Sequence, residues 1–184
     1  MAEFTGRDAK YNFLLDLDPL PKMIQEALKL YGTREQPGLQ NDNRVIMEWV
    51  DELADPGVRS VYTHDSVPWC GLFMAIVAKR AGKTPVQNPL WALNWGHFGS
   101  SAGQPMLGDV LTFMRPNGGH VALYIGESQS SYHLLGGNQS DMVCFTEISK
   151  ERFRKARRPL YQVQPETVKP YLLGSDGSFS TNED

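Results

Sequence analysis

The hydrophobic pattern of this chain changes its period once, near Gly108, and this change limits the class of fold. Before Gly108 the apolar residues recur at intervals of three and four. After it they form short runs rich in β-branched and aromatic residues, separated by Gly, Asn, Ser and Pro. Helices followed by strands are typical of an α+β domain. We therefore expect N-terminal helices packed on an antiparallel sheet of about five strands.

Helix start and stop signals divide the first half of the chain. A first helix is predicted to open at Pro19 and Pro21 and to end at Gly32, because proline fits the first turn and glycine suits the position after the last. A second helix is expected to be capped within residues 41–43 and to stop at Pro56. A third is predicted from Pro68 to Gly82, and a shorter one over 88–98. The third is almost wholly apolar, which predicts a helix at the centre of the domain.

Five segments are predicted as strands: DVLTFMR, HVALYIGE, YHLLGG, MVCFTEI and RPLYQV, which begin at residues 109, 120, 132, 142 and 158. With the helices they form one predicted domain over residues 18–164. Residues 1–17 are expected to be a loosely held arm. The polar tail, 165–184, is expected to be disordered.

The charge balance argues against nucleic acid as a partner. Eighteen Lys and Arg face 21 Asp and Glu, for a net charge of −3, and we interpret the basic run 150–158 as surface. No stretch approaches the ~20 apolar residues of a membrane span, and residues 1–10 lack the pattern of a signal peptide. We expect a protein made in the cytoplasm, which would need a delivery route to act outside it.

The two cysteines lie in different settings, and only one suits catalysis. Cys70 falls in the first turn of the predicted third helix, where unpaired N–H groups and the helix dipole favour a thiolate and an oxyanion. Cys144 alternates with Val143 and Phe145 in a predicted strand and is expected to be a core residue. Neither has the Cys or His companions of a zinc site, so no metal and no cofactor are expected.

A histidine and an asparagine follow paired glycines at predicted strand ends. His120 opens a strand in NGGHVALYIG, a rigid and partly open position suited to a general base. Asn138, in HLLGGNQSD, can accept a hydrogen bond from the imidazole and fix its tautomer. A polar or structural role is expected for the other three histidines: His64, His97 and His133.

Five motifs, in this order, resemble the NlpC-type and CHAP cell-wall hydrolases. They are PWCG at 68–71, PMLGDVLTF at 105–113, GGHVALYIG at 118–126, LLGGNQSD at 134–141 and RRP at 157–159. The resemblance covers about residues 20–160 and is strongest to a compact subgroup found in phages and bacteria. It implies a papain-like core with Cys70 as nucleophile, His120 as general base and acid, and Asn138 as the orienting third residue.

One position departs from the common NlpC-type pattern, in which an aspartate precedes the cysteine. Trp69 stands there instead, so the residue that completes the oxyanion hole stays open. The other candidate substrate-binding residues flank the three catalytic ones: Trp69, Gly71, Tyr62, Asp65, Trp95 and Gly119. Glu35 matches a subgroup pattern and fits a loop salt bridge as well as a substrate contact. Further aromatic candidates for a groove are Trp91, Phe98 and Tyr124.

The resulting hypothesis is a peptidoglycan hydrolase, a cysteine endopeptidase or amidase, that cleaves an amide bond in cell-wall stem peptide. Its mechanism would be acyl transfer through a thiolate held by an imidazolium. Two alternatives stay open: an acyltransferase that uses the same three residues, and a wall-binding module without activity. The expected partners are the stem peptide and, where the enzyme is exported, a delivery system or an inhibitor. A monomer is expected.

Overall fold

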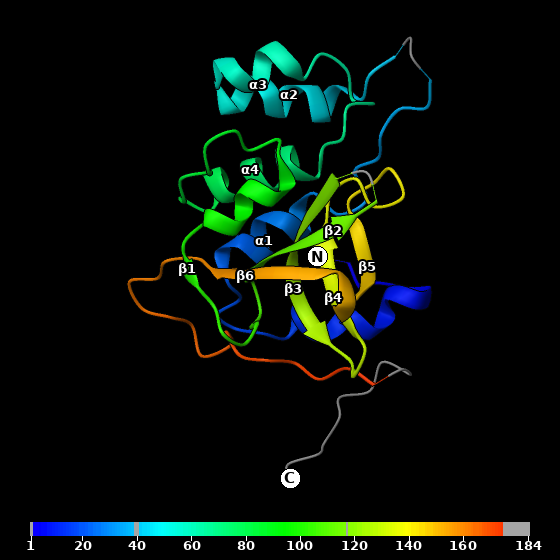
Figure 1. The fold of residues 1–184 in the computed structure, drawn as a ribbon. Coiled ribbons are helices and arrows are strands. Elements are labelled where there is room, and N and C mark those ends of the chain that lie inside the picture. The colour runs from blue at the N-terminus through cyan, green and yellow to red at the C-terminus, as the bar shows by residue number, and fades with distance from the viewer. Residues whose placement is uncertain (1, 39–40, 117, 175–184) are drawn as a thin grey trace.

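The computed structural model describes residues 2–38, 41–116 and 118–174, and it is an α+β fold built on one antiparallel sheet (Figure 1). The strands are β1 (Ser100–Ser101), β2 (Val110–Arg115), β3 (Gly118–Glu127), β4 (Ser131–Gly136), β5 (Cys144–Ser149) and β6 (Phe153–Arg158). Their spatial order is β1-β6-β2-β3-β4-β5, so the last strand of the chain inserts between β1 and β2. The predicted class is confirmed, with six strands instead of about five.

The helices precede the sheet in the chain: η1 (Gly6–Leu15), α1 (Lys22–Lys29), α2 (Arg44–Leu53), α3 (Pro56–Val61) and α4 (Cys70–Arg80), followed by the short η2 (Ala92–His97) and η3 (Lys150–Arg152). Asn43 caps α2 as expected, since its side chain accepts from the N–H groups of Val45 and Ile46. Pro56 does not simply stop that helix. It occupies the first turn of α3, whose cap is Asp55.

Helix α4 lies at the centre of the fold, between α2 and the sheet (Figure 1). All residues from Leu72 to Ala78 are buried, which agrees with the almost continuous apolar sequence. Each large aliphatic or aromatic side chain buried there contributes about 2 kcal/mol. A second apolar cluster includes Leu111, Phe113 and Tyr124. Along the strands these residues alternate with residues of the main core cluster. Packing on α4 fixes where the N-terminal end of this helix, and therefore Cys70, stands.

The predicted strand over 158–163 is wrong. The sixth strand is formed by the basic run itself, Phe153–Arg158, and residues 159–163 are outside any strand. Long basic side chains suit this strand because Arg154 and Lys155 are exposed and β1, its outer neighbour, has only two residues. In the segment that follows, Leu160 and Val163 are largely exposed.

Both terminal segments pack more closely than their sequences suggested. In the arm, Tyr11 and Leu14 are buried, and the Tyr11 ring stacks on Phe145 with 4.1 Å between centroids. In the expected disordered tail, Leu173 is buried and donates its N–H to the carbonyl of Glu127. Residues 165–174 are therefore part of the packed structure, and 175–184 lie outside the described residues. None of the helices in the described part is long and apolar enough to span a bilayer.

Candidate active site

The sulfur of Cys70 lies at the first turn of α4, beside the start of β3. The side chain is only 4% exposed. Burial raises the pKa of this thiol, whereas the N–H of Val121, the positive charge of Arg115 and the N–H groups of Gly71 and Cys70 itself lower it. Val121 directly follows His120 in β3, so the backbone N–H at the thiol belongs to the residue after the predicted base. The helix-terminal N–H groups at Cys70 and Gly71 are also positioned to hold an oxyanion.

His120 is completely buried, and both of its ring nitrogens have partners. The distance from Nε2 to Oε1 of Gln139 is 2.9 Å, and Nδ1 lies 2.8 Å from a terminal guanidinium nitrogen of Arg115. Arginine can only donate, so Nδ1 accepts and the proton of the neutral imidazole is on Nε2, which donates to Gln139. The tautomer is therefore fixed from both sides.

Gln139, and not Asn138, is the residue that holds the imidazole. Strand β4 ends at Gly136, and Asn138 has a left-handed backbone with φ of 53°. The chain turns there, so that the side chain of the next residue faces His120. The amide of Gln139 is oriented in turn by its Nε2, which donates to the carbonyl of Cys144 at 2.5 Å. Within the described segments the Asn138 side chain makes no hydrogen bond to His120.

The expected thiolate–imidazolium pair is absent from this arrangement. Burial first, and then the positive charge of Arg115, lower the pKa of His120 to about 3, while Gln139 acts in the opposite direction. Burial also raises the pKa of Cys70. No hydrogen bond joins the sulfur to the imidazole in the part of the chain described here. The site therefore holds a neutral thiol and a neutral imidazole, and Arg115 occupies Nδ1 of that imidazole.

Two predicted substrate contacts, Trp69 and Gly71, belong to the scaffold around Cys70. The ring of Trp69 is fully buried, and its Nε1 donates to the Glu35 carboxylate at 3.1 Å. Gly71 is required because a Cβ there would lie 2.3 Å from the carbonyl oxygen of Pro89. The backbone that approaches this glycine is the chain's own segment 89–90, not a substrate.

Three further candidates also serve internal contacts. Trp95 is fully buried and its indole donates to the same Pro89 oxygen at 2.9 Å, which anchors the segment over α4. Tyr62 is buried and donates to the backbone carbonyl of Asp65. Asp65 is buried as well, and its Oδ2 accepts from the N–H groups of Gln36 and Asn43. It organises the loop before α2 instead of forming a site wall.

Glu35 forms no salt bridge with a described residue; its partner is the Trp69 indole. Burial raises the pKa of Glu35, the Trp69 hydrogen bond lowers it, and the nearby charges of Asp141 and Asp65 raise it again. This side chain ties the loop at 33–36 to Trp69, the residue that precedes Cys70.

Gly119 is half-buried beside His120, and the Leu93 side chain covers it; a Cβ on Gly119 would lie 2.7 Å from the Leu93 Cγ. Of the other aromatic candidates, Phe98 and Tyr124 are buried, whereas Trp91 is 74% exposed. Leu93, which lies against Gly119, is 42% exposed and therefore remains open to a ligand.

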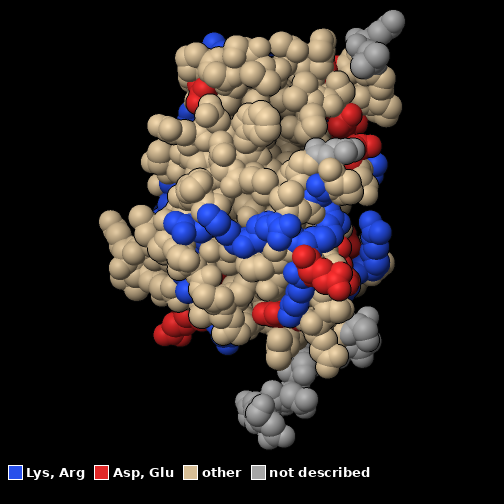
Figure 2. All heavy atoms as spheres, in the orientation of Figure 1, with Lys and Arg blue, Asp and Glu red and all other residues tan. Residues whose placement is uncertain are grey.

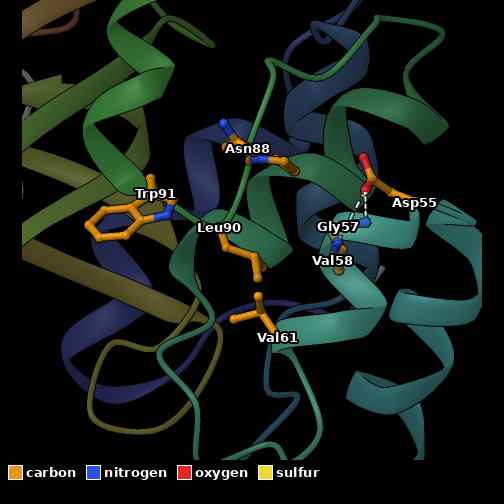
Figure 3. A pocket seen from close by; sticks show the side chains of 8 residues that line it. Asp55, Gly57, Val58, Val61, Asn88, Leu90 and Trp91 are labelled. Carbon is orange, nitrogen blue, oxygen red and sulfur yellow. Dashed lines mark hydrogen bonds between the residues drawn. The ribbon is translucent and has the colours of Figure 1, made fainter.

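The structure also has a small cavity of about 70 Å³, and none of the predicted catalytic residues lines it. Its lining consists of Asp55, Gly57, Val58, Val61, Asn88, Pro89, Leu90 and Trp91. In Figure 3 the side chains of Leu90 and Val61 face one another, and the Trp91 ring is directed away from them. Asp55 is engaged as the cap of α3. The cavity is separate from the Cys70 site.

The described residues contain no cluster of His, Cys, Asp and Glu able to hold a metal ion, and both cysteines are free thiols. Two residues of the site were not predicted: Gln139 and Arg115. Gln139 lies within the LLGGNQSD motif, next to the predicted Asn138. Arg115 ends a predicted strand five residues before His120, a spacing that places it across a tight hairpin. No protein-family model matches the chain, and no curated protein is significantly similar to it in sequence.

Proposed function

We propose that this chain is a cysteine hydrolase with a papain-like core, of the NlpC and CHAP kind, which cleaves an amide bond in bacterial cell-wall peptide. The observation that carries the proposal is the meeting of α4 and β3. A cysteine at a helix N-terminus adjoins the N–H that follows a buried histidine, and an amide side chain holds that histidine in one tautomer. The motifs resembling cell-wall hydrolases supply the substrate class.

Each residue has a defined part in the reaction. The sulfur of Cys70 attacks the peptide carbonyl, and Nδ1 of His120 takes the thiol proton and later delivers it to the leaving amine. Gln139 positions the imidazole by accepting from Nε2. The N–H groups of Cys70 and Gly71 stabilise the oxyanion. Water then hydrolyses the thioester.

The test is digestion of purified peptidoglycan by the wild type and by Cys70→Ser, with Cys144→Ser as the matched control. Loss of the nucleophile should lower the rate of muropeptide release at least about 1,000-fold, and the control should keep most of it. Mass spectrometry of the products identifies the bond and separates hydrolysis from transfer to an amine. Release by Cys70→Ser at the wild-type rate would refute the assignment.

A further inference from the structure

Arg115 and His120 are brought together by the β2–β3 hairpin. Arg115, the last residue of β2, is opposite Gly118, and Phe113, two residues earlier, is opposite His120. Side chains two residues apart share a face of the sheet, so the guanidinium and the imidazole are diagonal neighbours. The resulting hydrogen bond of 2.8 Å occupies the lone pair of Nδ1.

The Arg115 guanidinium is half-buried and lacks an anionic partner. Among the residues that the structure describes, no carboxylate oxygen lies within 4.0 Å of it. A guanidinium binds a carboxylate through two parallel hydrogen bonds. A neutral imidazole is therefore a weaker partner for it than a carboxylate. The present partner is therefore one that an incoming carboxylate would replace.

The surroundings of Arg115 are also basic. Arg152 donates to the carbonyl of Met114, and its positive charge acts on His120. Arg154 and Lys155 are exposed on β6, and Figure 2 shows a row of Lys and Arg side chains across the face where β6 lies. Although the chain carries a net charge of −3, this face attracts anions.

We propose that Arg115 is a specificity-determining residue that recognises a carboxylate of the substrate, and that its transfer from His120 to this carboxylate frees Nδ1 for catalysis. The inference rests on the proposed function and deepens it, because it defines the substrate as a peptide with a free carboxylate near the scissile amide.

Transfer of Arg115 to the substrate carboxylate leaves Nδ1 of His120 free to accept the thiol proton. Once Arg115 binds the carboxylate, the thiol proton of Cys70 moves to Nδ1 and the thiolate attacks the carbonyl carbon. The carbon–nitrogen bond breaks, the imidazolium protonates the leaving amine, and a thioester remains. The carboxylate also neutralises the charge of Arg115, so imidazolium forms beside a compensated cation. A substrate without the carboxylate leaves Arg115 on the base.

Alkylation of Cys70 tests the inference without any wall substrate. In full-length protein carrying Cys144→Ser, rates are measured with iodoacetate, which has a carboxylate, and with the uncharged iodoacetamide; in both the thiolate displaces iodide. Dividing the two rates removes differences in thiol reactivity. We expect Arg115→Met to lower this ratio about 10-fold, Arg115→Lys to stay within about 3-fold of the parent, and Arg154→Met to stay within about 2-fold.

The inference is overturned if Arg115→Met keeps the parent ratio, if the Lys variant falls as far as the Met variant, or if Arg154→Met has the same effect. The parent protein alone also tests the inference, because its ratio of iodoacetate to iodoacetamide rates must exceed the ratio measured for free cysteine. This comparison stays valid if a variant fails to fold.

A substrate experiment separates this inference from the proposed function. The wild type should cleave muropeptides with free carboxylates at least about 10-fold faster, in kcat/KM, than the same peptides with those carboxylates amidated, and Arg115→Met should lose the preference. Equal rates of the wild type on both would overturn the role of Arg115 and leave the hydrolase assignment intact. If the wild type cleaved neither kind of muropeptide, the proposed function would be overturned instead. The alkylation ratio would still test the role of Arg115.

Discussion

Burial of a neutral His120 makes the fold sensitive to acid, and the size of the effect follows from its surroundings. The pKa of His120 is lowered from its ordinary value of 6.5 to about 3, chiefly by burial and then by Arg115. Below pH 6.5 the unfolded chain binds a proton at this position that the folded protein does not bind until about pH 3. Stability is therefore fully present above pH 6.5 and is lost as the pH falls toward 3.

The gap between the two pKa values corresponds to a loss of about 5 kcal/mol at its limit, and of about 3 kcal/mol at pH 4.5. His120→Gln removes this proton-binding site, so its free energy of unfolding should fall about 3 kcal/mol less than that of the wild type between pH 7.5 and pH 4.5. Carboxylates elsewhere titrate in both proteins and cancel in the comparison.

The assay is urea unfolding followed by tryptophan fluorescence at the two pH values. His97→Gln, which removes an exposed imidazole, is the matched control and should retain the wild-type loss. If the wild type and His120→Gln lose stability equally, to within about 0.5 kcal/mol, a neutral buried imidazole is the wrong description of the site.

Two further predictions concern the support of the site. Gln139→Ala should lower kcat about 100-fold by releasing the imidazole, whereas Asn138→Gly, which suits the left-handed backbone, should stay within about 3-fold; steady-state kinetics on muropeptides would contradict this ranking if the order were reversed. Gly71→Ala should lower the free energy of unfolding by about 2 kcal/mol, because its Cβ meets the Pro89 oxygen, and Gly103→Ala, in open space, should change it by less than about 0.5 kcal/mol in the same urea titration.

The sequence was sufficient for the features that local patterns determine. The class of fold, the cap at Asn43 and the place of Cys70 at the start of an apolar helix all depend on residues close together in the chain. The partner of His120 depends instead on the backbone after β4. One left-handed residue at 138 decides whether the asparagine or the glutamine faces His120, and strand periodicity carries no information on that choice.

Burial was the second property that composition did not reveal. Tryptophan and glycine beside a cysteine fit an open site as well as a scaffold. Only the contacts of Trp69 with Glu35, and of Gly71 with Pro89, show that these residues build the scaffold. The sixth strand was missed because its residues are basic: hydrophobic alternation is a poor signal for a strand whose side chains are largely exposed.

The position of β6 has a consequence for how the protein is made. β2 pairs with β3 on one side and with β6 on the other, and β6 is formed by residues 153–158, close to the end of the described chain. During synthesis the first helices and the β2–β5 meander emerge before the segment that covers the outer edge of β2. The hairpin with Arg115 and His120 is therefore synthesised before β6, the strand that pairs with β2. Until β6 is made, nascent chains expose the unpaired edge of β2, and chaperones protect edges of this kind.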